Sequence, residues 1–179
     1  MKIKNRLFLL GAAMAVMSSS AFADTTGTQT FTATVTADTC TIANLNQAVD
    51  LGNVLRADYA SVGDWNVPAN ATLVSVNFDV TGCGNNITTV NVTPTFTAEP
   101  TLARFVKNAG TAAGIAFDTA KLSNTDFDKS RTWENGVTKA FTLTNGAVQV
   151  PVVGALSKNT QAVTAGTLDF QMTFAFDFV

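Results

Sequence analysis

The sequence of 179 residues has no histidine, only two cysteines and a low content of charged residues, 13%. Without histidine, the side chain that most often serves as a general base is missing. The two cysteines are too far apart for a CxxC redox or zinc motif, and the glycine patterns of P-loops and dinucleotide sites do not occur. We therefore expect no enzyme activity, no catalytic residues, no metal site and no cofactor.

Basic residues are also scarce. The 11 lysines and arginines are outnumbered by 13 acidic residues, which gives a formal net charge of −2. Such a chain lacks the basic surface that nucleic-acid binding requires, so no nucleic-acid partner is predicted. Several charges gather at Asp126, Asp128 and Lys129. They lie in a polar stretch, residues 123–135, that we expect to be a solvated loop.

The first 23 residues have the three parts of a secretory signal peptide. Three basic residues precede an apolar run at residues 7–17, and Ala21-Phe22-Ala23 provides a cleavage site. A transmembrane anchor is the alternative, but the run is well short of the roughly 20 apolar residues that span a bilayer. Cleavage before Asp24 removes three basic residues and no acidic ones, so the formal charge falls from −2 to −5. The mature chain is expected to be exported.

The mature sequence favours an all-β domain, because it is rich in Thr, Val, Phe and Ala and shows no helical period. We expect strands at residues 31–35, 40–42, 49–51, 73–83, 88–97, 114–119, 137–143 and 147–153. Asn145-Gly146 suits a type I′ turn that joins the last two as a hairpin. Residues 56–71 and 101–113 are expected to be surface loops or brief helical turns.

The two cysteines, Cys40 and Cys83, are expected to form one disulfide, because the chain is exported and no other metal ligands lie near them. About seven strands at this spacing, with one disulfide, favour an immunoglobulin-like β-sandwich.

The end of the chain, residues 168–179, predicts a long strand with one buried face. Every second position is apolar: Leu168, Phe170, Met172, Phe174, Phe176 and Phe178. A terminal strand this apolar needs a neighbour on each edge, because an uncovered edge promotes aggregation.

From residue 27 to the end, the sequence resembles the type 1 fimbrial major-pilin family of chaperone–usher pili. The resemblance rests on motifs in a fixed order: Gly27 and Phe31 ahead of Cys40, then Val49-Asp50-Leu51-Gly52, Phe78-Asp79-Val80 before Cys83, Gly114-Ile115-Ala116-Phe117, Gly166, and the penultimate aromatic Phe178.

The resemblance implies an incomplete immunoglobulin-like fold that lacks its seventh strand and is completed by a donor strand. A periplasmic chaperone first lends this strand, and at an outer-membrane usher the N-terminal extension of another subunit replaces it. The chain then divides into a signal peptide, residues 1–23, a donor extension, residues 24–36, and a pilin domain, residues 37–179. The product is a fimbria on the cell surface.

Alternation in the donor extension assigns one face to insertion. That face carries Thr25, Gly27, Gln29, Phe31, Ala33 and Val35. Phe31 is the expected anchor, and Gly27 is expected to fill a tight pocket, as the glycine of the family does. Thr25 and Gln29 depart from the family, which often places apolar groups at these positions.

On the acceptor side, the resemblance implies that the C-terminal residues line the groove and bind the chaperone. They are Gly166, Leu168, Phe170, Met172, Phe174, Phe176, Phe178 and Val179. Basic residues of the chaperone are expected to grip the Val179 carboxylate. The alternative is that these side chains are ordinary core residues of a complete sandwich.

Three functions stay open. The first is a structural pilin that polymerises with copies of itself or related pilins and supports cell adhesion. The second is an adhesive or adaptor subunit that binds a host receptor, either a glycan or a protein, through loops that carry Tyr59, Trp65 and Trp133. The third is an exported enzyme or free binding protein with a complete sandwich.

Overall fold

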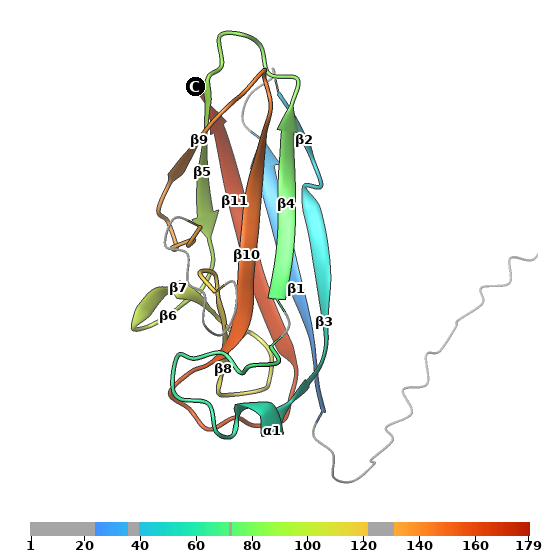
Figure 1. Cartoon of the computed structure of the whole chain (residues 1–179), viewed down its shortest axis with the longest axis vertical. Helices are drawn as coiled ribbons and strands as arrows, with labels where there is room; N and C mark the ends of the chain where they lie inside the picture. Colours follow the sequence, from blue (N-terminus) through green and yellow to red (C-terminus); the bar gives the residue numbers. More distant parts are fainter. Residues whose placement is uncertain (1–23, 36–39, 72, 122–130) are drawn as a thin grey trace, which may run out of the picture.

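The computed structural model describes residues 24–35, 40–71, 73–121 and 131–179, so the predicted signal peptide lies outside the described residues. Two β-sheets pack face to face (Figure 1). The first has the order β3-β1-β11-β5-β9, with β3 Asn46–Leu55, β1 Asp24–Val35, β11 Leu168–Phe178, β5 Thr89–Thr95 and β9 Lys139–Thr142. The second has the order β2-β4-β10-β8-β7-β6, with β2 Thr41–Ala43, β4 Leu73–Thr81, β10 Val148–Lys158, β8 Ile115–Asp118, β7 Leu102–Lys107 and β6 Ala98–Glu99. The predicted all-β sandwich is confirmed.

The core lies between the two sheets and is built from alternate residues of facing strands. In β4 the buried residues are Val74, Val76, Phe78 and Val80, as their alternation predicts. The Phe78 ring lies 5.2 Å from that of Phe174 and 5.4 Å from that of Phe176, between centroids, so β4 packs directly on β11. Such tilted and edge-on pairs suit the charge distribution of aromatic rings.

The Cys40–Cys83 disulfide that the sequence predicts is present, and it joins the residue before β2 to a residue shortly after β4. The helix α1, Arg56–Tyr59, is a single turn in the segment expected to hold loops or brief helical turns. Among the described residues, no helix is long and apolar enough to cross a membrane.

Two predicted connections are wrong. The turn at Asn145-Gly146 exists, with the φ of both residues positive, but β9 and β10 enter different sheets and only Thr144 and Ala147 form a bridge across it. In a sandwich the chain can cross from one sheet to the other at such a turn. The second is the segment 101–113, expected to be a surface loop or brief helical turns. It contains the strand β7, which pairs with β6 and β8.

Two further boundaries differ from expectation. The strand expected to stop at Gly52 continues to Leu55, because a positive φ at Gly52 and a register shift let it keep pairing with β1. Within the stretch expected to be a solvated loop, residues 122–130 lie outside the described residues. Trp133 also belongs to the stretch expected to be a solvated loop, but it is buried, and its indole N–H donates to the carbonyl of Pro151.

Candidate functional site

The first and last strands lie side by side at the centre of one sheet (Figure 1, blue and red). β1 runs parallel to β11, from Gly27 opposite Leu168 to Val35 opposite Phe176, and antiparallel to β3 on its other edge. Each edge of β11 is therefore covered, by β1 on one side and by β5 on the other. The groove expected beside the C-terminal strand is filled by the N-terminal segment of the same chain.

The face of β1 that enters the core is the one that alternation predicts. Gly27, Gln29 and Phe31 are buried, and Ala33 packs partly buried against the core. The Phe31 ring lies 6.4 Å from the Phe174 ring. Thr25 and Val35 belong to the strand, but their side chains lie outside the described residues. Burying a phenylalanine contributes roughly 1.5–3 kcal/mol, so Phe31 is the strongest described apolar contact of this strand.

Gly27 fits a position with no room for a side chain. A Cβ there would lie 2.8 Å from the Cβ of Leu168, 3.2 Å from its carbonyl oxygen and 3.1 Å from Cδ1 of Leu51. With contacts this short the neighbouring atoms would have to move, so glycine allows a close approach of β1 to β11 at this position.

Gln29 differs from its neighbours on the buried face. Its side chain is 0% exposed, and neither Oε1 nor Nε2 has a hydrogen-bond partner. Its Cα partners are Phe170 on β11 and Val49 on β3, neither of which offers a polar side chain. The sequence identified Gln29 as a departure from an apolar pattern, and the structure shows that the amide pairs with nothing.

The predicted acceptor residues divide into two groups. Leu168, Phe170, Met172, Phe174 and Phe176 are buried in the core. Phe178 is half-buried, Val179 is 54% exposed, and Gly166 lies just before β11. The backbone of Val179 is fixed, because one oxygen of its carboxylate accepts from the N–H groups of Thr88 and Thr89.

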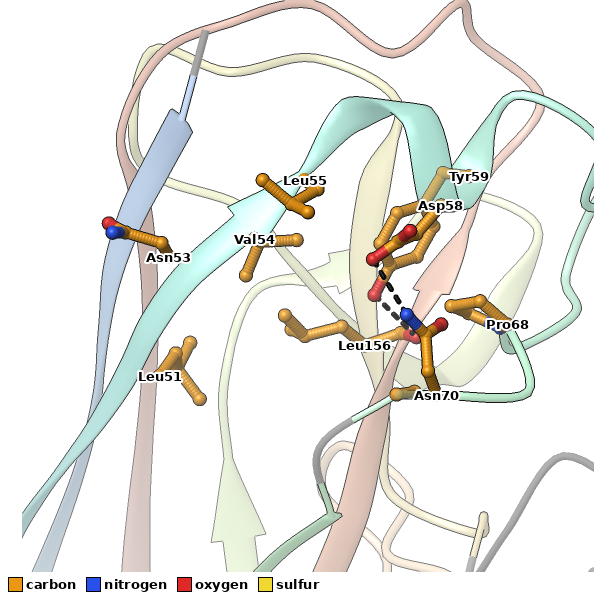
Figure 2. Close-up of a pocket in the computed structure, with 10 residues that line it drawn as sticks. Leu51, Asn53, Val54, Leu55, Asp58, Tyr59, Pro68, Asn70 and Leu156 are labelled. Carbon is orange, nitrogen blue, oxygen red and sulfur yellow. Dashed lines mark hydrogen bonds between the residues drawn. The ribbon is translucent and has the colours of Figure 1, made fainter. Parts of the chain in front are cut away.

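A small pocket lies beside α1, between the ends of β3 and β10 (Figure 2). Its volume of about 50 Å³ is far below the several hundred Å³ of a typical ligand site. The Tyr59 hydroxyl donates to the carbonyl of Leu156, and the Asn70 amide donates to Asp58. Burial, with Asp58 beside it, raises the pKa of Tyr59, so the phenol keeps its proton. The pocket is too small for a typical ligand, and the polar side chains of Tyr59, Asn70 and Asp58 in its wall are hydrogen-bonded within the protein.

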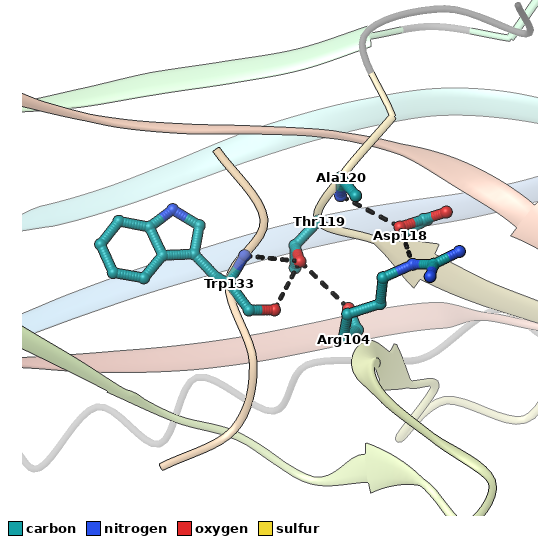
Figure 3. A network of polar contacts seen from close by, with 5 residues as sticks. All are labelled: Arg104, Asp118, Thr119, Ala120 and Trp133. Carbon is teal, nitrogen blue, oxygen red and sulfur yellow. Dashed lines mark hydrogen bonds and ion pairs between the residues drawn. The ribbon is translucent and has the colours of Figure 1, made fainter. Parts of the chain in front are cut away.

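A buried polar network lies around the end of β8 (Figure 3). Asp118 is 0% exposed, and its Oδ1 accepts from the Arg104 Nε at 3.2 Å and from the Ala120 N–H at 3.0 Å. Burial raises the pKa of Asp118, against the lowering effect of these two donors. The Thr119 Oγ1 accepts from the Trp133 N–H and lies 2.6 Å from the Trp133 carbonyl oxygen.

This network joins β7, β8 and the segment around Trp133. Sequence reasoning missed it, because Arg104, Asp118 and Thr119 form no motif and meet through strand pairing. The described residues contain no group of three or more histidine, cysteine or acidic side chains that could hold a metal ion. The network has the properties of a structural link.

The three aromatic residues considered for sugar stacking serve the fold. Tyr59 and Trp133 are buried, and the half-buried Trp65 packs edge-on against Phe105 at 4.8 Å between ring centroids.

Comparison with known proteins supports the architecture. No family model matches the sequence, and no curated protein matches it. Among solved structures, the crystal structure of the P pilus rod subunit PapA is similar, with a TM-score of 0.59 and 19% sequence identity. The match covers 79% of this chain and 100% of that chain. At this identity the likeness concerns the fold, and the chain has a pilin-like fold.

Proposed function

We propose that this chain is a structural subunit of a chaperone–usher pilus, which polymerises when β1 of one copy enters the groove beside β11 of another. The supporting observation is that β1 fills the space between β3 and β11 and brings Phe31 into the core. Without β1, the strand β3 loses its neighbour in the described sheet and β11 has an open apolar edge. The groove thus requires a strand, whichever copy supplies it.

A strand that fits its own groove also fits the same groove of a second copy. The contact joins two different surfaces, the N-terminal strand and the groove, so repetition produces an open fibre. The intramolecular arrangement is then the form of an isolated subunit. During export, a periplasmic chaperone covers the open edge and an outer-membrane usher exchanges it for β1. The exposed Val179 at the end of β11 is accessible to basic residues of the chaperone.

In this proposal the fibre lies on the cell surface, and the assembled fibre, not the single subunit, supports cell adhesion. An adhesive or adaptor subunit that binds a host receptor is the alternative. The three aromatic residues that would carry sugar stacking pack into or against the core, so the structural role is the one that the described contacts favour.

A cross-link that locks β1 in its own groove tests this proposal. The Oγ1 atoms of Thr32 on β1 and Thr173 on β11 lie 3.0 Å apart on the outer face. A Thr32→Cys, Thr173→Cys variant can form a disulfide there without disturbing the core. The variant is expressed with a fimbrial chaperone and usher, and cells are examined for fibres by electron microscopy.

We expect the locked variant to fold but to form no fibres, because it can neither donate nor accept a strand. A matched control links another threonine pair, Thr93→Cys with Thr138→Cys, whose Oγ1 atoms lie 2.7 Å apart away from β1. This control and the single substitutions should polymerise like the wild type. Fibres from the locked variant would contradict the proposal, as would fibres from a chain that lacks residues 24–36.

A further inference from the structure

Gln29 is an anomaly within the core. Among the largest side chains of the described residues that are fully buried, all others are aromatic or aliphatic. An amide buried without partners loses its hydrogen bonds to water and gains none in return. The position of Gln29 is fixed by alternation, because a shift of β1 by one residue would turn Phe31 out of the core and threonines into it.

The strand β1 is irregularly paired on the Gly27 side of Gln29. The pairing of β1 with β3 shifts register between Gly27 and Thr28. An open hollow of about 590 Å³ lies there, lined by residues that include Gly27, Asp50 and Leu168. Beyond Gln29, by contrast, Phe31 packs against Phe174 and Thr32 bonds to Thr173.

We propose that the unpaired Gln29 amide keeps β1 removable, so that the self-filled subunit is a temporary form from which the strand is passed to another copy. Release starts at the Gly27 end and proceeds through Gln29 to Phe31. This inference rests on the proposed function and adds how the same groove is regulated.

Hydrogen exchange on the isolated full-length mature chain tests this inference. Gln29→Met keeps the shape of the side chain and removes the amide, and Gln29→Leu serves as a second variant. Thr34→Val is the matched control, because Thr34 lies on the exposed face of the same strand. The variant cross-linked between residues 32 and 173 gives the exchange rate of a strand that cannot leave.

Relieving a buried unsatisfied amide should slow exchange of the β1 amides by between about fivefold and about a hundredfold. Amides of residues 27–29 in the wild type should exchange faster than those of residues 31–34. Slower β1 exchange in either Gln29 variant supports the inference, while unchanged or faster exchange in both overturns it. Because no fibre is involved, this result is independent of whether the locked variant polymerises.

Discussion

The strands β1 and β4 both supply alternate side chains to the core of the sandwich, yet their buried faces differ in kind. In β4 the face is apolar throughout, formed by Val74, Val76, Phe78 and Val80. In β1 the described members of this face are one glycine, one glutamine, one phenylalanine and one alanine: Gly27, Gln29, Phe31 and Ala33. One strand maximises apolar contact, and the other has a single large apolar anchor among its described side chains.

Their attachments differ as well. β4 pairs with β2 and β10, and Cys83 just after it is linked to Cys40. β1 pairs parallel to β11 and antiparallel to β3, and no disulfide lies beside it among the described residues. The contrast agrees with the proposal that β1 passes between copies while β4 stays in the fold.

The largest expected effect comes from removing a buried ring in either strand. Both Phe31→Ala and Phe78→Ala should lower the free energy of unfolding by about 3–5 kcal/mol. If β1 is exchangeable as proposed, a peptide of residues 24–36 takes the place of β1 but not of β4. Added peptide should therefore restore the denaturation midpoint of Phe31→Ala and leave that of Phe78→Ala unchanged, as measured by urea unfolding.

The control is the same peptide with Ala at position 31, which should restore much less. Equal recovery of both variants would remove the distinction between the two strands, and so would a failure of the wild-type peptide to help Phe31→Ala.

A smaller effect is expected at Gly27, where β1 leaves no room for a side chain against Leu168 of β11. Gly27→Ala places a Cβ 2.8 Å from that of Leu168 and should lower the free energy of unfolding by about 1–3 kcal/mol. The matched control is Gly63→Ala, whose Cβ would meet the movable Asn66 side chain at 3.1 Å. Thermal unfolding of the two variants makes the comparison, and an unchanged midpoint for Gly27→Ala would show that the contact with Leu168 relaxes freely.

The buried face of the last strand could be predicted from the sequence, because large aromatic residues at period two leave one orientation for the strand. The faces of β1 and β4 followed from the same rule. Whether β1 fills its own groove could not be predicted, since one alternating pattern fits the same groove in the same chain or in another copy.

Other features depend on contacts distant in sequence. The turn at Asn145-Gly146 was recognised from local preference, but the division of its flanking strands between two sheets depends on the packing of the whole sandwich. The link between Arg104 and Asp118 arises from the pairing of β7 with β8, and no spacing in the sequence indicates it.

The smallest effect is expected from changing Asp118 in that link. The measurement tests whether pH acts on the stability of the whole sandwich or on the release of β1. Burial raises the pKa of Asp118 above its ordinary value of 3.8, so the folded chain binds this proton to higher pH than the unfolded chain does. The contribution of Asp118 to stability is therefore present at low pH and is lost as pH rises from about 4 through the folded-state pKa. Asp118→Asn stays neutral, so its stability relative to the wild type should increase with pH, as urea unfolding at several pH values would measure.

Because Asp118 lies in β8, in the sheet of β4, hydrogen exchange of the β1 amides through local release should keep the same pH dependence in both proteins. Parallel stability curves for the two proteins would contradict the raised pKa. A different pH dependence of β1 exchange in Asp118→Asn would show that Asp118 and β1 are coupled.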